Sequence, residues 1–232
     1  LPTLWHLLEK GASLVLMSHL GRPKGTVSSG LSLGPVATEL HGHLGTSVLM
    51  APDCVGEETA ELARDLKAGN VLLLENLRFH KEEEANDTAF AKQLAELGSG
   101  IYVNDAFANC HRRHASMVAI TKHLPSFAGL LLENEIKHMD YAMERHGRPL
   151  TVILGGAKAH TKIGIIEYFK KKADHILLGG GVANTFLKAQ GVDVGASLYD
   201  KDTNIKPFLK YKNIHLPTDW LEEKGKILDI GP

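Results

Sequence analysis

The chain contains little cysteine, no long hydrophobic run and almost no net charge. The two cysteines, Cys54 and Cys110, are too few for a disulfide-based scaffold and fit a reducing compartment, so we expect a cytoplasmic protein. No stretch approaches the roughly 18 continuous apolar residues of a membrane span. A net charge of −1 over 232 residues argues against a general binder of nucleic acids or membrane surfaces. We therefore expect small-molecule ligands, with no nucleic acid and no membrane among the partners.

Several familiar motifs are also missing. No GxxxxGK[ST] sequence is present, which excludes a P-loop. No GxGxxG follows an apolar run with an acidic residue about twenty positions later, which disfavours a dinucleotide oxidoreductase. His111 and His114 of the HRRH sequence could share a helix face, but no HExxH and no cysteine pair accompanies them. Metal ligation by these histidines is therefore disfavoured, and hydrogen bonding of uncharged histidine to the backbone is the plainer interpretation.

Five short apolar runs are present instead, and each breaks off into a loop of glycine and polar residues. The runs occupy residues 13–18, 71–76, 101–105, 151–154 and 175–178. Because they do not alternate apolar and polar residues, we expect strands buried on both faces of a parallel sheet. Helical patterns flank the runs at residues 4–10, 33–44, 57–68, 86–97, 163–172 and 182–190. This alternation predicts a doubly wound α/β fold, in which ligands bind at the carboxyl ends of the strands.

One predicted helix differs from the others in its length and in its stop signal. Residues 131–146 form a long helical pattern that ends in Gly147-Arg148-Pro149, and glycine followed by proline ends a helix. We therefore predict a domain boundary in this region. The predicted parts are an N-terminal domain at 1–132, an interdomain helix and linker at 133–149, and a partial C-terminal domain at 150–232.

The loops of the first predicted domain carry positive charge. After the first three runs they supply His19, Arg22, Arg78, His111, Arg112, Arg113 and His114. Any one arginine could be solvated or paired with an acidic residue such as Glu75 or Glu82–Glu84. If the strands are neighbours, however, the charges converge, and like charges repel unless a ligand neutralises them. Since the arginine fork binds phosphate and carboxylate bidentately, we predict a small phosphorylated acid as the ligand.

The second predicted domain has glycine-rich turns after two consecutive runs. Gly155-Gly156-Ala157-Lys158 follows the first run, with Lys162 nearby, and Gly179-Gly180-Gly181 follows the second. Glycine lets a ligand approach the backbone closely, but one such turn more often reflects tight packing. Two turns in succession, one of them with lysines, favour a nucleotide. An anion site in one domain and a phosphate site in the next predict phosphoryl transfer, which depends mostly on positioning and charge stabilisation.

At these residues the chain resembles the phosphoglycerate kinase family. The shared sequences are SHLGRPKG (18–25), LLENLRFHKEEE (73–84), VNDAF with HRRHASM (103–117), ILGGAK with the following lysine (153–162) and GGGVANTFLKAQG (179–191). Together, in the family's order and across nearly the whole chain, these motifs are highly specific. The resemblance implies two Rossmann-like, three-layer α/β/α halves with parallel sheets, joined by a long helix, with the second half incomplete.

The resemblance also implies reversible phosphoryl transfer in glycolysis, between 1,3-bisphosphoglycerate and ADP, giving 3-phosphoglycerate and ATP. In the N-terminal half, it places the phosphoglycerate on His19, Leu20, Gly21, Arg22, Arg78, His111 and Arg112. In the C-terminal half, it places ATP or ADP with Mg²⁺ on Gly156, Ala157, Lys158, Lys162, Gly179 and Gly180. Lys162 and Lys158 would act on the transferring group, and no protein ligand to the metal is assigned. The whole protein is expected to be a cytoplasmic monomer.

The chain departs from the family pattern at several positions. Ala108 replaces a small flexible glycine, Arg113 adds a charge, and Thr161 stands where an aspartate linked to the metal is common. The family's first strand, with its D-x-N motif, and its later GGGD[ST] loop are not present in these 232 residues. We therefore expect little or no kinase activity from this chain alone. The alternative is a non-catalytic remnant that retains a phosphoglycerate-binding or nucleotide-binding site.

Overall fold

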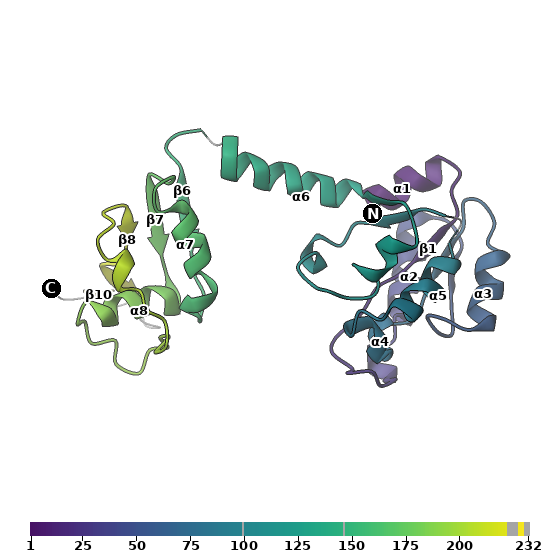
Figure 1. Cartoon of the computed structure of the whole chain (residues 1–232), viewed down its shortest axis with the longest axis horizontal. Coiled ribbons are helices and arrows are strands. Elements are labelled where there is room, and N and C mark those ends of the chain that lie inside the picture. Colours follow the sequence, from purple (N-terminus) through teal and green to yellow (C-terminus); the bar gives the residue numbers. More distant parts are fainter. Residues whose placement is uncertain (99, 146, 222–226, 230–232) are drawn as a thin grey trace. The chain divides into compact units, whose positions relative to one another are not determined.

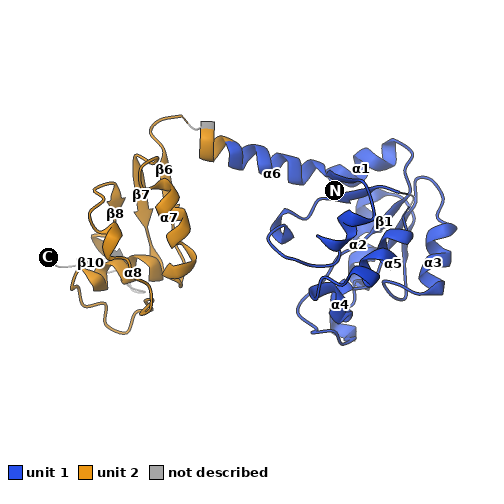
Figure 2. Ribbon diagram, viewed as in Figure 1, with its two compact units in different colours: residues 1–140 blue, residues 141–232 orange. Residues whose placement is uncertain are grey.

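The chain forms two compact units. A computed structural model describes residues 1–98, 100–145, 147–221 and 227–229. Unit 1 comprises Leu1–Asp140 and unit 2 comprises Tyr141–Pro232 (Figure 2). The boundary between the units lies within the segment 133–149, for which a linker was predicted. The assignment of one ligand to each half stays a prediction.

Parallel strands form the centre of each unit. Each of the five predicted runs contains a strand, namely β1 (Leu14–Leu16), β3 (Val71–Leu73), β4 (Tyr102–Asn104), β6 (Thr151–Leu154) and β7 (His175–Leu178). Short parallel partners complete the sheets, namely β2 (Val48–Met50), β5 (Ser126–Ala128) and β8 (Ile214–His215). The sheets have the orders β1-β3-β2, β4-β5 and β6-β7-β8, which confirms the α/β class (Figure 1). An antiparallel pair, β9 (Asp219–Leu221) with β10 (Ile227–Asp229), lies near the C-terminus.

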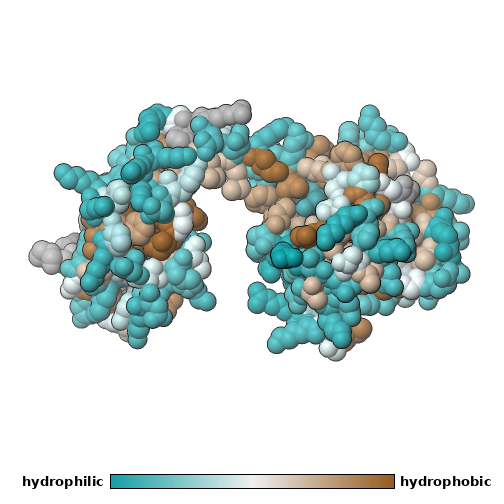
Figure 3. All heavy atoms as spheres, viewed as in Figure 1, coloured by the Kyte–Doolittle hydropathy of each residue, from teal (hydrophilic) through white to brown (hydrophobic). Residues whose placement is uncertain are grey.

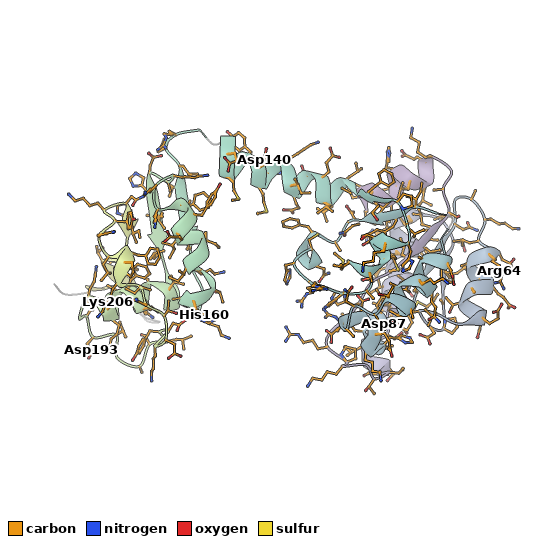
Figure 4. The ribbon with its side chains drawn as sticks, in the orientation of Figure 1. Arg64, Asp87, Asp140, His160, Asp193 and Lys206 are labelled. Atoms are coloured by element: carbon orange, nitrogen blue, oxygen red, sulfur yellow. The ribbon has the colours of Figure 1, made fainter. Side chains whose placement is uncertain are left out.

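Helices cover both faces of β3, the central strand of the first sheet in unit 1. The helices of this unit are α1 (Pro2–Glu9), α2 (Gly34–Leu44), α3 (Glu57–Arg64), α4 (Lys81–Glu84), α5 (Thr88–Glu96) and α6 (Leu130–Asp140). On one face, Leu72 packs in a cluster with Phe90 of α5, whose N-terminus is capped by Asp87 (Figure 4). On the other face, Leu73 packs with Ala37 of α2. Complete burial of β3 explains its continuous apolar sequence.

A groove separates the two sheets of unit 1. Strand β1 pairs with β3, whereas β4 pairs with β5, and no ladder joins β4 to β1 within the described residues. The groove between them has a volume of about 490 Å³ and is lined by residues such as Val15 and Met17 on one side and Tyr102 and Val103 on the other. The carboxyl ends of β1 and β4 are therefore not held together by strand pairing.

Helix α6 begins with a side-chain cap. Asp105 Oδ1 accepts hydrogen bonds from the backbone N–H groups of Leu131 and Leu132, at 2.9 and 3.2 Å. Asp105 Oδ2 accepts one from Thr3 Oγ1 at 2.7 Å. The predicted helix 131–146 is α-helical over Leu130–Asp140 and π-helical over Tyr141–Arg145, and residue 146 lies outside the described residues.

Unit 2 buries one face of its sheet. Helices α7 (Ile163–Phe169) and α8 (Gly180–Ala189) supply Ile166 and Phe186 to a core that includes Ile176 of β7. On the opposite face, Ile153 is 76% exposed and Leu177 is 38% exposed. Atoms of hydrophobic residues are visible at the molecular surface among those of hydrophilic residues (Figure 3).

Short helical turns fill several of the remaining loops. The 3₁₀ turns used below are η2 (Leu77–Phe79), η3 (Phe107–Asn109) and η6 (Ala159–Thr161); the others are η1 (Ser29–Leu31), η4 (Ala119–Lys122) and η7 (Lys206–Phe208). Across the described ranges, no helix is both long enough and apolar enough to span a lipid bilayer.

Candidate functional site

Arg78 lies at the centre of the predicted cationic site in unit 1. It belongs to η2, directly after β3, and its side chain is only 6% exposed. Its Nη1 atom donates a hydrogen bond to the backbone oxygen of Gly21 at 2.8 Å. Its Nε atom lies 3.4 Å from Glu84 Oε1, but this contact is not aligned as a hydrogen bond. The arginine therefore packs against the loop after β1, and its Nε–H has no hydrogen-bond acceptor among the described residues.

Cations from all three loops gather around His19. Burial lowers the pKa of His19 most strongly, and the nearby Arg78, His114 and Arg112 lower it further, while Glu84 opposes them. The structure thus brings together His19 of the first loop, Arg78 of the second and Arg112 of the third. Sequence reasoning proposed this convergence from strand order, yet β4 does not pair with β1, and the loops meet without a shared ladder.

Two buried donors in this cluster have no partner. The Nε atoms of Arg78 and Arg112 are buried and make no hydrogen bond within the described residues. An unsatisfied buried donor costs about 1–3 kcal/mol, and more when it is charged. An anion that accepts from these groups would remove that cost, so the cluster is suited to a phosphate or carboxylate.

The remaining predicted residues of this site lie on the same loops. Arg22 and His111 have exposed side chains, and within the described part of the chain neither makes a hydrogen bond or ion pair. Leu20 and Gly21 contribute backbone carbonyl groups, which already accept hydrogen bonds from side chains after β3. Direct contact of these residues with a ligand stays a prediction.

The glycine turns of unit 2 pack tightly against each other. The backbone N–H of Val182 donates to Gly156 O at 3.1 Å. A Cβ atom placed on Gly181 would lie 2.7 Å from Ala157 O, closer than van der Waals contact allows. Gly156 and Gly180 both have positive φ, at +119° and +60°, which favours glycine. The packing interpretation therefore holds for Gly181, while the nucleotide roles of Gly156, Ala157, Gly179 and Gly180 stay predictions.

The lysines of unit 2 lie on this glycine strip. Lys158 is exposed, while Lys162 is partly buried and its Cε lies 3.9 Å from where a Cβ of Gly156 would be. Thr161, the position that departs from the family pattern, donates from Oγ1 to Lys158 O at 2.8 Å. Two lysine side chains lie beside glycines whose backbone a ligand can approach closely. This arrangement is suited to binding the phosphate groups of a nucleotide.

A neighbouring carboxylate is already engaged by η6. Asp200 Oδ2 accepts from the backbone N–H of His160 at 3.0 Å and lies 2.7 Å from His160 Nδ1 (Figure 4 labels His160). These two hydrogen bonds, the backbone one first, hold the pKa of Asp200 well below its usual range. Asp200 thereby anchors the loop around residue 200 to the segment that carries the lysines.

The structure also shows polar groups that sequence reasoning missed. Asn76 and Glu83, both almost fully buried, contact the loops of the cationic cluster. Asn76 was counted only as the last residue of an apolar run, and Glu83 was treated only as one member of an acidic series. Within the described residues, Asp53, Cys54 and His80 form the one group of metal-ligand type.

Polar contacts hold that group together. His80 Nε2 lies 2.6 Å from Asp53 Oδ1, and the Cys54 thiol donates to Glu75 O at 3.0 Å. Burial, and then the nearby carboxylates of Asp53, Glu75 and Glu83, strongly raise the pKa of Cys54. These contacts connect the loop after β2 to the segment from Glu75 to His80.

Comparison with known proteins places these features in a family. A family model described as phosphoglycerate kinase matches residues 1–227. The phosphoglycerate kinase of Moorella thermoacetica is 52% identical over 202 residues, which cover 87% of this chain and 51% of that protein. The cytosolic phosphoglycerate kinase of Triticum aestivum is 49% identical over 227 residues, which cover 94% of this chain and 56% of that protein.

Solved structures give the same answer for the fold. Phosphoglycerate kinase from Coxiella burnetii matches with a TM-score of 0.78 and 34% identity, covering 99% of this chain and 61% of that one. The enzyme from Pyrococcus horikoshii matches with a TM-score of 0.81 and 30% identity, covering 99% of this chain and 62% of that one. The chain spans about half the length of the curated relatives it matches.

Proposed function

This chain belongs to the phosphoglycerate kinase family, and we propose that the protein catalyses reversible phosphoryl transfer between 1,3-bisphosphoglycerate and ADP. The products are 3-phosphoglycerate and ATP. One observation carries the proposal: unit 1 gathers His19, Arg78 and Arg112. The Nε–H groups of the two arginines are buried donors that have no partner among the described residues. Such a site needs an anionic ligand, and a phosphorylated carboxylic acid supplies two anionic groups.

We propose that unit 1 binds the phosphoglycerate. Arg78 and Arg112 provide the guanidinium groups, and Arg22 and His111 add donors from the same loops. The lowered pKa of His19 keeps its ring neutral at pH 7, so it acts as a hydrogen-bonding group beside the charges. The loop residues Leu20 and Gly21 shape the backbone around the acid. Bidentate contacts to fixed arginines hold the reacting group in one orientation, which is the main requirement of phosphoryl transfer.

We propose that unit 2 binds the nucleotide. The strip of Gly156, Ala157 and Lys158 receives the phosphate chain, and Gly179 and Gly180 lie toward the base. Lys162 and Lys158 neutralise charge on the transferring phosphoryl group, which is where the transition state concentrates negative charge. No covalent intermediate on the protein is required by this chemistry.

Mg²⁺ is proposed to enter with the nucleotide. Mg²⁺ prefers carboxylate, phosphate and water oxygens. Residues 155–162 carry lysines, a histidine and a threonine but no carboxylate, and the nearby Asp200 is occupied by His160. The described residues of the strip thus do not fit a resident magnesium ion, and its charge neutralisation would come with the nucleotide phosphates.

The proposal extends to the setting of the protein. Both cysteines are free, as expected in a reducing compartment. We propose a cytoplasmic, monomeric protein whose partners are 3-phosphoglycerate or 1,3-bisphosphoglycerate and ATP or ADP. Its place is glycolysis, in the step that exchanges a phosphoryl group between an acyl phosphate and ADP.

Calorimetric titration tests the two sites separately. Arg22→Ala should weaken 3-phosphoglycerate binding at least tenfold and leave ADP binding within twofold, because a charge-assisted contact contributes about 1.5–3 kcal/mol. Lys162→Ala should do the reverse. Equal losses of both ligands in either variant would contradict the assignment. A coupled assay with 1,3-bisphosphoglycerate and ADP measures turnover, which we expect to be low or absent in this chain alone, and normal turnover would contradict that expectation.

A further inference from the structure

The segment that links β3 to α4 carries two buried polar side chains that bind neighbouring loops. Asn76 is 0% exposed and Glu83 is 2% exposed. Buried polar groups are costly unless all their hydrogen bonds are made. Both residues meet that condition by bonding to loops far away in the sequence rather than to their own segment alone.

Asn76 ties down the loop after β1. Its Nδ2 atom donates to Leu20 O at 2.8 Å and to Leu31 O at 2.9 Å. Its Oδ1 atom accepts from the backbone N–H of Arg78 at 3.1 Å. One amide group therefore fixes both ends of the first loop relative to the arginine at the centre of the cationic cluster.

Glu83 ties down the loop after β4. Its Oε1 accepts from Ser116 Oγ at 2.6 Å and its Oε2 accepts from Ser116 N at 3.0 Å. Its own backbone oxygen accepts from Ala115 N at 2.8 Å, and His114 Nδ1 lies 3.6 Å from Oε1. Three hydrogen bonds thus hold Ala115 and Ser116, which lie three and four residues after the cluster's Arg112.

These contacts join the first and third loops to the segment between β3 and α4. Among the described strands, β4 pairs with β5 and β1 pairs with β3. We propose that Asn76 and Glu83 are positioning residues, which hold the first and third loops so that His19, Arg78 and Arg112 meet around one anion. This inference rests on the proposed function in identifying that anion as a phosphoglycerate.

The proposed positioning role and a simple charge effect predict changes of opposite direction in anion affinity. Glu83 is negative and near a cationic site, so removing its charge alone should strengthen anion binding through space. Removing a positioning contact should weaken it instead. Glu82 is adjacent, carries the same charge and makes no side-chain hydrogen bond within the described residues, so it provides a matched control.

The Asn76 arm uses Asn76→Ala in the full 232-residue chain, titrated with 3-phosphoglycerate and with ADP. We expect 3-phosphoglycerate affinity to fall at least tenfold and ADP affinity to stay within twofold. The control is Asn213→Ala, because Asn213 Nδ2 also donates to two carbonyls, Lys170 O at 3.2 Å and Ala173 O at 2.8 Å, but in unit 2. This control should lose stability without losing 3-phosphoglycerate affinity. Unchanged affinity in a folded Asn76→Ala chain would overturn the inference for Asn76.

The Glu83 arm compares Glu83→Ala with Glu82→Ala. Alanine at position 83 removes both the charge and the two side-chain contacts with Ser116, whereas alanine at position 82 removes a charge alone. We expect Glu83→Ala to weaken 3-phosphoglycerate binding at least fivefold, while Glu82→Ala leaves it equal or tighter. If both substitutions tighten binding equally, Glu83 acts by charge and the inference is wrong for that residue.

Hydrogen exchange keeps this test independent of the proposed function. Asn76→Ala should speed backbone amide exchange in residues 18–31, and Glu83→Ala should speed it in residues 111–116, with the other loop unchanged. If the unaltered chain binds neither 3-phosphoglycerate nor inorganic phosphate, the proposed function fails, and the exchange data alone decide whether these residues hold the loops. Should Asn76→Ala not fold, Asn76→Ser keeps one donor and is expected to show the same effects at smaller size; no effect from a folded Asn76→Ser would count against the inference.

Discussion

The two units hold their cationic groups in different ways. In unit 1, Arg78 is 6% exposed, and buried side chains such as Asn76 and Glu83 fix the loops around it. In unit 2, Lys158 is exposed, and the strip beneath it is shaped by backbone packing of glycines. The first arrangement fixes side chains before a ligand arrives, whereas the second fixes only the backbone.

This difference suggests a division of work. A buried arginine loses little conformational entropy on binding, so unit 1 is suited to orienting a small acid in a single pose. Exposed lysines beside a glycine backbone can bind a flexible phosphate chain in more than one conformation. Their long side chains lose conformational entropy when the phosphate chain binds. Substitutions in unit 1 should therefore affect stability and affinity together, and those of exposed lysines in unit 2 should affect affinity alone.

The largest effect is expected from Arg78→Met. This change removes the hydrogen bond to Gly21 O and leaves that loop carbonyl without its donor. The free energy of unfolding should fall by about 2–3 kcal/mol, and 3-phosphoglycerate affinity should fall at least tenfold. Urea denaturation and calorimetric titration measure the two quantities. Arg78→Lys should recover only part of either, because a single ammonium lacks the planar fork; full recovery would contradict the role assigned to the guanidinium group.

Gly181→Ala should destabilise unit 2. The added methyl group would lie 2.7 Å from Ala157 O, and because that atom belongs to the backbone, the two glycine turns must move apart. We expect a loss of about 1–3 kcal/mol in unfolding free energy and weaker ADP binding. Gly164→Ala is the control, since a Cβ there meets nothing within 4 Å. Thermal unfolding of both variants checks this, and equal melting temperatures would show that the turns are not in contact.

Asp200→Asn tests the anchor beside the lysine strip through pH. The pKa of Asp200 is lowered on folding, so its contribution to stability is present above the ordinary aspartate pKa of about 3.9 and is lost as the pH falls below it. The variant should therefore melt at a lower temperature than the unaltered chain at pH 7. The difference between the two melting temperatures should become smaller below about pH 4. Melting curves between pH 3 and pH 7 measure it. A gap that is constant with pH would mean that the charge of Asp200 does not contribute.

The smallest effect on stability is expected from Lys158→Ala. Because this side chain is exposed, the free energy of unfolding should change by no more than about 0.5 kcal/mol. ADP affinity should still fall, and the loss should shrink at high salt because exposed charges are screened. Titrations at low and high ionic strength provide the measurement. A large loss of stability would erase the contrast between the two units.

Much of the fold followed from local pattern. The five apolar runs became strands, and the helices predicted at residues 4–10, 33–44, 57–68, 86–97, 163–172 and 182–190 are present with shifted ends. Strands β2, β5 and β8 were not predicted. They have only two or three residues each, and all three residues of β5 are exposed, so no apolar run marks that strand.

The candidate site was predictable only in part. Arginine after several strands was visible in the sequence, and Arg78 and Arg112 do share one cluster. Their supports were not visible, because Asn76 bonds to Leu20, 56 residues away, and Glu83 bonds to Ser116, 33 residues away. Polar residues in loops are common, and nothing local distinguishes a buried one that makes such bonds from an exposed one.

The sequence by itself determined the alternation of strands and helices, the family and the positive charge of the loops after the strands. These properties depend on residue type and on spacing along the chain, and both can be read from the sequence without knowing which distant residues are in contact. Only the tertiary structure decided which charges are buried, which donors lack partners and which side chains hold the loops. Those properties arise from contacts between residues distant in the chain, where burial turns an ordinary asparagine or glutamate into a structural support.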